Sequence, residues 1–256
     1  MKIDVIHSLF SKSSGISTDT RTIEKKNIFF CLKGQNFNGN LFIDQALSLG
    51  ASFVIYDEEK LNHKSKKAIK VKNALETLQA LAKYHRSKFN IPVIGLTGSN
   101  GKTTSKELFN IVLSKKFNVT CTSNNFNNHI GVPLTILEIN KKTDLAIIEM
   151  GANHIGEIDL LCRIADPNIG YITNFGKAHL EGFGGIDGVI QGKCELYEHI
   201  RQKKGMILVN NNDSIQREKS RGIKSISFGK SKESNYLINN STSNKNLCEA
   251  NINKKK

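Results

Sequence analysis

One short stretch, TGSNGKTT at residues 97–104, combines residue types that are suited to holding phosphate groups. Gly98 and Gly101 permit backbone angles and a close approach that a Cβ would block. Successive N–H groups in such a turn, at the start of a helix, form an anion-binding nest. Lys102 would reach the β- and γ-phosphates, and the hydroxyl of Thr103 would bind Mg²⁺. The stretch therefore predicts a site for ATP or GTP.

The loop is a variant of the usual phosphate-binding pattern. That pattern places a glycine five residues before Gly101, where this chain has Leu96. An ordinary glycine-rich turn is the alternative. It is disfavoured because an apolar strand precedes the loop and Lys-Thr-Thr closes it.

Three polar side chains downstream suit the same chemistry, although each has a plainer reading. Glu149 ends an apolar strand, where parallel-sheet sites collect ligands, and its carboxylate can bind Mg²⁺. Taken alone, it is equally a strand-end carboxylate that faces solvent. His179 can bind a second cation or a phosphate, yet a lone histidine is more often structural. Lys193 lies on a predicted helix, where a surface lysine is the commoner reading.

The elements that must position these residues alternate regularly from residue 91 onward. Apolar strands that alternate with helices indicate an α/β fold with a mostly parallel sheet covered on both faces. A polar loop, NNFNNHIGVP, interrupts the pattern at 124–133. The expected strands cover 92–97, 118–123, 144–150, 168–174, 205–210 and 225–229, and the expected helices cover 102–115, 156–165 and 186–201.

The first 90 residues have a different and less regular pattern. A helix is expected over 73–89, because apolar residues and His85 recur at helical spacing, and Pro92 follows it. A domain boundary is therefore expected near 88–91. At the other end, residues 230–256 are rich in Ser, Asn and Lys without periodicity, which predicts a loose tail. Shorter elements are expected as strands at 27–32, 51–56 and 68–71 and as a helix at 40–50.

Composition narrows the class of protein. The 256 residues carry a net charge of +14, but the lysines form short scattered clusters without interleaved aromatic residues. This favours a solvated lysine-rich surface that assists anionic substrates, and it disfavours nucleic-acid binding. No apolar run is long enough for a membrane span, and the first 15 residues lack the apolar region and cleavage site typical of a secretory leader, so a cytoplasmic location is expected. The five cysteines form no CxxC pair, which argues against a zinc site or a disulfide framework.

Five stretches occur in a characteristic order: TGSNGKTT, NNFNNHIGVPLT, EMGANHIGEI, TNFGKAHLEGFG and GKCELYE. Together they resemble the Mur ligase family of peptidoglycan synthesis. The segment at 17–51, which begins STDTRTIEKKNIFFCLKG, resembles that family's uridine-nucleotide-binding domain. The resemblance implies a small N-terminal α/β domain at 1–88 that binds the UDP-muramoyl-peptide. It implies an incomplete P-loop ATPase-type central domain at 89–238, and it leaves a polar, disordered tail at 239–256.

The resemblance also implies a reaction. ATP phosphorylates the terminal carboxylate of UDP-N-acetylmuramoyl-tripeptide, and the amine of D-alanyl-D-alanine attacks the acyl phosphate to give an amide, ADP and phosphate. Charge neutralisation must dominate such a reaction, because a carboxylate approaches a triphosphate. The implied cofactors are ATP and Mg²⁺. A cytoplasmic, monomeric ligase of cell-wall biogenesis, with effects on cell shape and cell division, is the expected setting.

Site residues follow from the resemblance at matching positions. Lys102, Glu149, His179 and Lys193 are the implied catalytic residues. Thr103 and Glu149 would hold a first Mg²⁺, and His179 a second, helped by Lys193 if that lysine is carbamylated. The ATP contacts would be Gly98, Ser99, Asn100, Gly101, Lys102, Thr103, Thr104, Asn210 and Asp213, although the family more often has paired acids at the last two positions.

The substrate contacts are implied in the same way. Asn38 and Asn40 stand where many members have Asp and His, so this loop departs from the family pattern. The implied contacts to the UDP-muramoyl-peptide are Ser17, Thr18, Asp19, Arg21, Lys33, Gly34, Asn38, Asn127, Asn128 and His129.

The family pattern includes a third, C-terminal domain that helps to bind ATP and receives D-alanyl-D-alanine. These 256 residues end before the central domain would be complete. We therefore expect the nucleotide and UDP-substrate parts of a site that cannot complete ligation unaided. Three alternatives remain: another Mur-type ligase, such as the third-residue-adding enzyme or folylpolyglutamate synthase; a truncated, non-catalytic nucleotide-binding remnant; and a basic nucleic-acid-binding protein.

Overall fold

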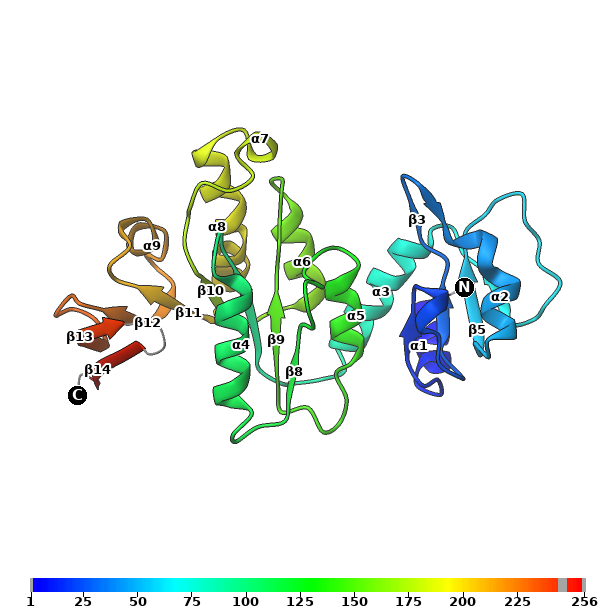
Figure 1. Cartoon of the computed structure of the whole chain (residues 1–256), viewed down its shortest axis with the longest axis horizontal. Helices are drawn as coiled ribbons and strands as arrows, with labels where there is room; N and C mark the ends of the chain where they lie inside the picture. Colours follow the sequence, from blue (N-terminus) through cyan, green and yellow to red (C-terminus); the bar gives the residue numbers. More distant parts are fainter. Residues whose placement is uncertain (1, 244–247, 255–256) are drawn as a thin grey trace.

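A computed structural model describes residues 2–243 and 248–254 and contains two separate α/β sheet systems (Figure 1). The smaller system is a parallel sheet in the order β1-β2-β5-β6. Its buried residues alternate between two clusters, Phe29 and Val54 in one and Phe30 and Ile55 in the other, as a strand period of two requires. Its elements are α1 (Ile3–Phe10), β1 (Ile16–Ser17), η1 (Thr20–Thr22), β2 (Ile28–Phe30), β3 (Lys33–Gly34), β4 (Phe37–Asn38), η2 (Gly39–Phe42), α2 (Ile43–Ser48), β5 (Phe53–Tyr56) and β6 (Ala68–Lys70).

The larger system is an eight-stranded sheet in the order β14-β13-β12-β11-β10-β7-β9-β8, parallel except for the β13–β14 pair. Its strands are β7 (Val93–Thr97), β8 (Val119–Cys121), β9 (Leu145–Glu149), β10 (Ile169–Ile172), β11 (Met206–Asn210), β12 (Lys224–Gly229), β13 (Tyr236–Ser243) and β14 (Cys248–Lys254). Its helices are α4 (Lys102–Leu113), α5 (Gly131–Leu137), α6 (Glu157–Ala165), α7 (Leu180–Phe183), α8 (Ile186–Gln202) and α9 (Ser214–Lys219).

Helices cover both faces of the large sheet, as the alternating pattern predicts. Phe109 of α4 packs in the cluster of Ile94 and Ile147 on one face. On the other face Leu196 of α8 lies against Gly95, where a Cβ would come within 3.1 Å of its Cδ1. Because β7, β9 and β10 are adjacent and parallel, their carboxyl ends lie at one edge of the sheet. Ligands of open α/β sheets bind at this edge.

Helix α3 (Ala74–Arg86) lies between the two sheet systems and contacts α1 on one side and α5 and α6 on the other (Figure 1). His85 Nδ1 and His7 Nε2 form a hydrogen bond of 3.0 Å. The Nε2 of His85 donates to the carbonyl of Ile139 at 2.7 Å. Arg86 donates to the carbonyl of Ala165 at 3.0 Å and to that of Phe89 at 2.6 Å. The helical spacing predicted this element, and the structure shows that its far end is bound to both flanking segments.

Helix α5 corrects the expectation of a continuous loop at 124–133. The helix begins at Gly131, and Pro133 lies in its first turn, where a missing N–H leaves no helical hydrogen bond unmade. The side chain of Asn128 accepts from the N–H groups of Ile130 and Gly131, which have no partner within the helix. A stretch rich in Asn and Pro therefore encodes a helix start.

The expected loose tail is also corrected for the described residues. Tyr236 and Leu237 at the start of β13 pair parallel with Phe228 and Gly229 of β12, and residues 248–254 return antiparallel to β13. The predicted end of the central domain at residue 238 falls inside β13, and the large sheet continues through β14 to Lys254. The last two residues of β12 gain a partner strand in this way, and such pairing needs backbone groups rather than apolar side chains. Composition alone therefore hides these strands.

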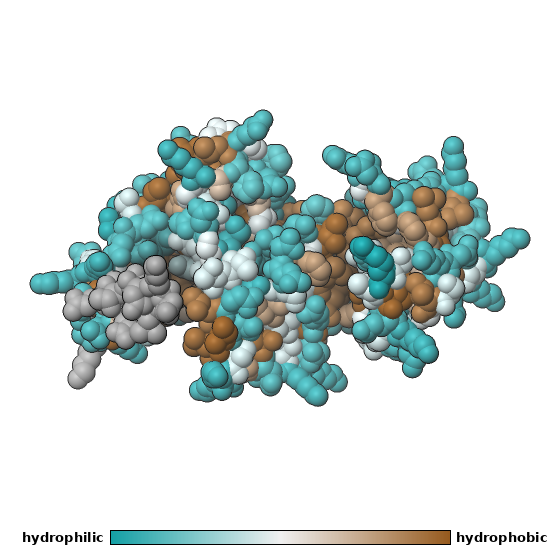
Figure 2. Space-filling view, viewed as in Figure 1, coloured by the Kyte–Doolittle hydropathy of each residue, from teal (hydrophilic) through white to brown (hydrophobic). Residues whose placement is uncertain are grey.

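The surface in Figure 2 is mainly hydrophilic, with polar side chains spread over both parts of the molecule. This agrees with the scattered lysine clusters of the sequence. Among the residues that the structure describes, no helix is long and apolar enough to cross a membrane.

Candidate functional site

The glycine-rich loop between β7 and α4 has the backbone geometry that its sequence predicts. Gly98 has φ +148° and Gly101 has φ +75°, and a Cβ on Gly98 would collide with the hydroxyl of Thr173. Helix α4 begins at Lys102, so its first N–H groups point out of the helix without intrahelical partners. These groups face the edge of the sheet where an anion would bind.

The ammonium of Lys102 folds back over this loop. Its Nζ donates to the carbonyl of Gly98 at 2.9 Å and to that of Ser99 at 3.4 Å. Burial lowers the pKa of Lys102, and the nearby carboxylate of Glu149 opposes that shift. A partly desolvated cation at the centre of the loop suits a phosphate group, because charge interactions strengthen away from water.

The loop is held by the segment that follows β10. The N–H groups of Ser99 and Asn100 donate to the carbonyl and side-chain oxygens of Asn174, at 3.1 and 3.2 Å. Thr173 donates its hydroxyl to the carbonyl of Asn100 at 2.6 Å. Two of the N–H groups predicted for ATP are therefore engaged within the protein, whereas those at the start of α4 have no intrahelical partner.

Glu149 is buried, with 1% of its surface exposed, which overturns the reading of a solvent-facing carboxylate. Its Oε1 accepts from the Thr103 hydroxyl at 3.3 Å and from the amide of Asn127 at 2.8 Å. Its Oε2 has no hydrogen-bond partner among the described residues. A buried carboxylate oxygen without a partner is unfavourable unless a cation or donor binds it. The residues present therefore fit a hard cation such as Mg²⁺.

Lys193 is likewise no surface lysine. It is 2% exposed on α8, and its ammonium lies 5.3 Å from the centroid of the Phe183 ring. Burial, with help from the charge of Lys102, lowers the pKa of Lys193 to about 8. The structure thus brings Lys193 into the electrostatic range of the phosphate loop.

His179 immediately precedes α7 with a left-handed φ of +53°. It lines a cavity of about 400 Å³ that also contains Lys102, and three of the predicted substrate residues line the same cavity: Asn127, Asn128 and His129. Residues that are widely separated in the sequence therefore converge beside the phosphate loop.

Two polar side chains that line this cavity, those of Asn153 and Glu157, were not among the predicted site residues. Glu157 accepts from the N–H of Asn153 at 2.6 Å and from that of His154 at 3.2 Å. Burial alone would raise the pKa of Glu157, but these N–H groups and the His154 side chain outweigh it, and the pKa is lowered. Both residues lie in the stretch EMGANHIGEI, so the motif signalled the place without assigning their roles.

Several predicted ligand contacts already make local bonds. Asp213 accepts from the N–H groups of Ile215 and Gln216 and so caps α9. The side chain of Asn210 accepts from the N–H of Asn212 at 3.0 Å. Asn128 caps the start of α5, as described above. These side chains first serve local backbone geometry.

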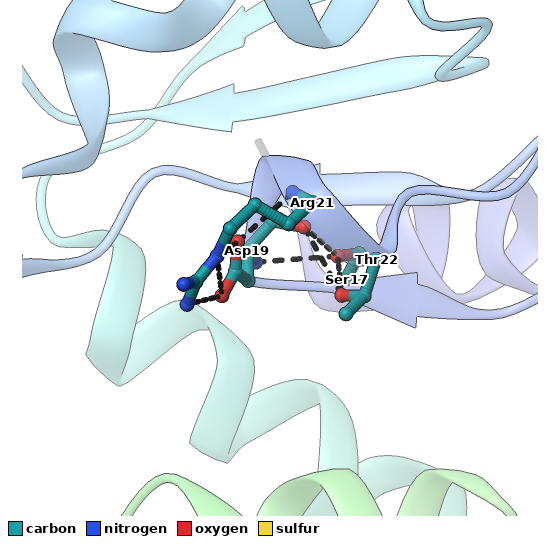
Figure 3. A network of polar contacts seen from close by, with 4 residues as sticks. All are labelled: Ser17, Asp19, Arg21 and Thr22. Atoms are coloured by element: carbon teal, nitrogen blue, oxygen red, sulfur yellow. Dashed lines mark hydrogen bonds and ion pairs between the residues drawn. The ribbon is translucent and has the colours of Figure 1, made fainter.

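The predicted uridine-diphosphate contacts lie on the smaller sheet system. Ser17 donates its hydroxyl to the carbonyl of Asp19 at 2.8 Å, and Arg21 forms an ion pair with the Asp19 carboxylate (Figure 3). Hydrogen bonds from Arg21 lower the pKa of Asp19 to about 2. Thr18 is half-buried next to this network. The charges of this cluster are therefore satisfied internally.

The hairpin that carries Lys33, Gly34 and Asn38 is anchored in a similar way. Lys33 Nζ lies 3.4 Å from the Asp57 carboxylate, and Asn40 donates to Asp57 Oδ1 at 3.1 Å. The other Asp57 oxygen accepts from the N–H of Ala74 at the start of α3. This network ties the hairpin to α3.

Comparison with known proteins agrees with these observations. The Mur ligase middle domain matches residues 96–255, and the Mur ligase family catalytic domain matches residues 12–86. The UDP-N-acetylmuramoyl-tripeptide–D-alanyl-D-alanine ligase of Bacillus subtilis is 39% identical over 203 residues, which are 79% of this chain and 44% of that protein. The chain thus spans about half the length of the curated relatives it matches.

Solved structures share the fold. A crystal structure of MurF from Acinetobacter baumannii superimposes with a TM-score of 0.83 at 32% identity and covers 93% of this chain and 52% of that one. MurF ligase from Thermotoga maritima in complex with ADP gives a TM-score of 0.83 at 29% identity, over 98% of this chain and 57% of that one.

Proposed function

The chain belongs to the Mur ligase family, and we propose that it takes part in the reaction of an ATP-dependent ligase that joins D-alanyl-D-alanine to UDP-N-acetylmuramoyl-tripeptide. The observation that supports it most is the buried Oε2 of Glu149, which has no hydrogen-bond partner in the described part of the chain and lies beside a phosphate loop that has its lysine in place. The names of the relatives favour this ligase over other Mur-type ligases. A monomer in the cytoplasm is part of the proposal.

In this proposal Lys102 and the first N–H groups of α4 bind the β- and γ-phosphates of ATP. Thr103 and Glu149 would hold a Mg²⁺ through the hydroxyl and the free carboxylate oxygen. A bound Mg²⁺ would offset negative charge as the substrate carboxylate approaches the triphosphate. Asn210 and Asp213, near the carboxyl end of β11, would meet the adenosine.

Lys193 and His179 would contribute to a second cation position. The lowered pKa of Lys193, about 8, leaves a neutral amine fraction on the order of a tenth at pH 7. That neutral amine can add CO₂, forming an N–C bond and releasing one proton, which converts a buried cation into a carbamate anion. Such an anion would suit a cation position that an ammonium would repel.

The substrate would extend from the smaller sheet system to the phosphate loop. Ser17, Thr18, Asp19 and Arg21 would meet the uridine diphosphate, together with Lys33, Gly34 and Asn38. Asn127, Asn128 and His129 would face the muramoyl-peptide. We propose a division into a UDP-substrate domain at 1–88 and an ATP-binding domain from residue 89, extended to Lys254 because β13 and β14 complete the sheet.

The test separates phosphorylation from ligation. The chain is mixed with ATP, Mg²⁺ and UDP-N-acetylmuramoyl-tripeptide, and hydroxylamine traps an acyl phosphate as a hydroxamate that mass spectrometry detects. We expect a hydroxamate that Lys102→Ala abolishes. Nucleotide binding without hydroxamate would instead support a non-catalytic nucleotide-binding protein. Failure to bind ATP or the UDP-substrate would contradict the proposal.

A further inference from the structure

Lys106, one turn beyond the lysine of the phosphate loop, has no exposed surface. Its ammonium donates to the carbonyl of Thr122 at 2.8 Å and to that of Asn124 at 3.4 Å, and it lies 2.8 Å from Glu107 Oε1. Lysine is almost never fully buried unless it is paired, because desolvating an ammonium is unfavourable. Three acceptors surround this ammonium, which has three donors to offer. The arrangement indicates a defined role for Lys106.

Both carbonyls belong to the loop that leaves β8. Within this loop Asn124 has a left-handed φ of +48°, a conformation that asparagine adopts more readily than most residues with a side chain. Farther along, the carbonyl of Asn127 accepts from the N–H of Gly151 at 2.7 Å. The loop is therefore attached to α4 at one end and to the exit of β9 at the other.

The same loop determines how Glu149 is held. The Thr122 hydroxyl accepts from the N–H of Glu149 at 3.0 Å, and the Asn127 amide donates to Glu149 Oε1 at 2.8 Å. One carboxylate oxygen is thereby bound, and the other is left without a partner among the described residues. The N–H of Thr122 also donates to the carbonyl of Ile147 in β9 at 3.0 Å. The Asn127 contact, farther along the loop, is therefore the one that depends on the carbonyls bound by Lys106.

We propose that Lys106 is a positioning residue for the cation site at Glu149. Its ammonium holds the loop from Thr122 to Asn127, so that Asn127 binds one oxygen of Glu149 and the other oxygen faces a cation. This inference rests on the proposed function, in which Glu149 binds the metal. Supporting residues around metal ligands commonly change metal affinity 10- to 100-fold when removed.

The test compares Lys106→Met with Lys115→Met, which removes an exposed lysine just beyond α4. Electron paramagnetic resonance measures Mn²⁺ binding in the presence of ADP, and calorimetry measures ADP binding in EDTA. We expect Lys106→Met to weaken Mn²⁺ binding about 10-fold or more, with metal-free ADP affinity within about 2-fold. Hydrogen exchange over 122–128 should become faster. Lys115→Met should match the wild type in all three measurements.

Two further variants make the outcome decisive. Lys106→Arg keeps a donor for the carbonyls and should recover most of the Mn²⁺ affinity. If Lys106→Met does not fold, Lys106→Gln replaces it with the same expected result. A folded variant with unchanged Mn²⁺ affinity and unchanged exchange over 122–128 would overturn the inference.

Glu149→Gln separates this inference from the proposed function. If Glu149→Gln binds Mn²⁺ as tightly as the wild type, the cation site itself is wrong. If Glu149→Gln loses Mn²⁺ while Lys106→Met does not, only the role of Lys106 is wrong.

Discussion

The phosphate-loop edge of the large sheet and the polar cluster of the smaller sheet satisfy their charges in opposite ways. At the large sheet, Glu149 and Lys193 are buried, and one Glu149 oxygen lacks a partner among the described residues. At the smaller sheet, Arg21 pairs with Asp19, and Lys33 lies between Asp57 and Glu58. The first region is arranged to receive charge from a ligand. The second must exchange an internal partner for a ligand, which costs little free energy at the exposed Arg21–Asp19 pair.

The largest expected effect is on nucleotide binding at the phosphate loop. Lys102→Ala removes a partly desolvated cation from the proposed phosphate position, so MgATP affinity should fall by about 10- to 100-fold. Isothermal titration calorimetry measures it, with Lys115→Ala as the control for lost surface charge. An equal loss in both variants would show that the loop has no special role.

Lys193, which is buried against the large sheet, should reduce stability, whereas the partly exposed Lys33 of the smaller sheet should not. Folding lowers the pKa of Lys193 from 10.5 to about 8. The charged form, which predominates at pH 7, is therefore less stable in the folded chain than in the unfolded chain. Lys193→Met should therefore raise the free energy of unfolding at pH 7 by about 1–3 kcal/mol. Lys33→Met should leave it unchanged or slightly lower.

Urea denaturation in CO₂-depleted buffer measures both variants. The stability advantage of Lys193→Met over the wild type should shrink as the pH rises from 8 toward 10.5, because over this range the unfolded wild type binds the Lys193 proton that its folded chain has released. The comparison cancels the buried cysteine thiols, whose raised pKa values lower the stability of both chains at high pH. A Lys193→Met variant that is less stable than the wild type, by a difference that does not change with pH, would contradict this account of the buried amine.

Helix α3, between the two regions, should make a smaller and pH-dependent contribution to the free energy of unfolding. Since the carbonyl of Ile139 can only accept, His85 Nε2 carries a proton, and neutral His85 offers Nδ1 to His7. Burial lowers the pKa of His85, so its contribution is complete above 6.5 and is lost as the pH falls below that value. His7→Phe should reduce the free energy of unfolding by about 1 kcal/mol at pH 7.5.

The reduction should shrink as the pH falls below 6.5, because burial and the charge of His85 lower the pKa of His7, and this source of acid destabilisation is absent from His7→Phe. Denaturation at several pH values measures it, and His154→Gln, on an exposed loop, is the control. A constant difference between His7→Phe and the wild type across this range would rule out a titrating contact.

The smallest effect concerns the exposed pair of the smaller sheet. Asp19 should titrate near 2, and Arg21→Ala should return its pKa toward 3.8. Its contribution to stability is present above 3.8 and is lost as the pH falls through about 2, and it should be small because the pair is exposed.

Carboxyl-resolved NMR follows this titration. If Arg21 leaves Asp19 for a diphosphate, adding UDP should raise the Asp19 pKa in the wild type. An unchanged Asp19 pKa in the UDP-bound chain would mean that this region does not exchange its partner.

The two regions also differed in how well the sequence predicted them. The phosphate loop and Glu149 were located because both follow apolar runs that predict parallel strands, and the ends of such strands collect ligands. In addition, Gly98 has a backbone angle that favours glycine. Burial of Lys193 was not predictable, because Phe183 reaches it only through tertiary packing. Helix α5 was missed because Asn128, a typical loop residue, acts as its cap. Strands β13 and β14 were missed because edge pairing uses backbone groups, which leave no apolar pattern.

Helix α3 has a mechanical consequence. Asp57 binds its first residue, and at its other end Arg86 binds carbonyls on both the linker and α6. A helix of 13 residues is about 20 Å long and resists bending. The helix therefore fixes the distance between the smaller sheet and the phosphate loop. A ligand that bridges the two regions would be selected by its length as well as by its charge.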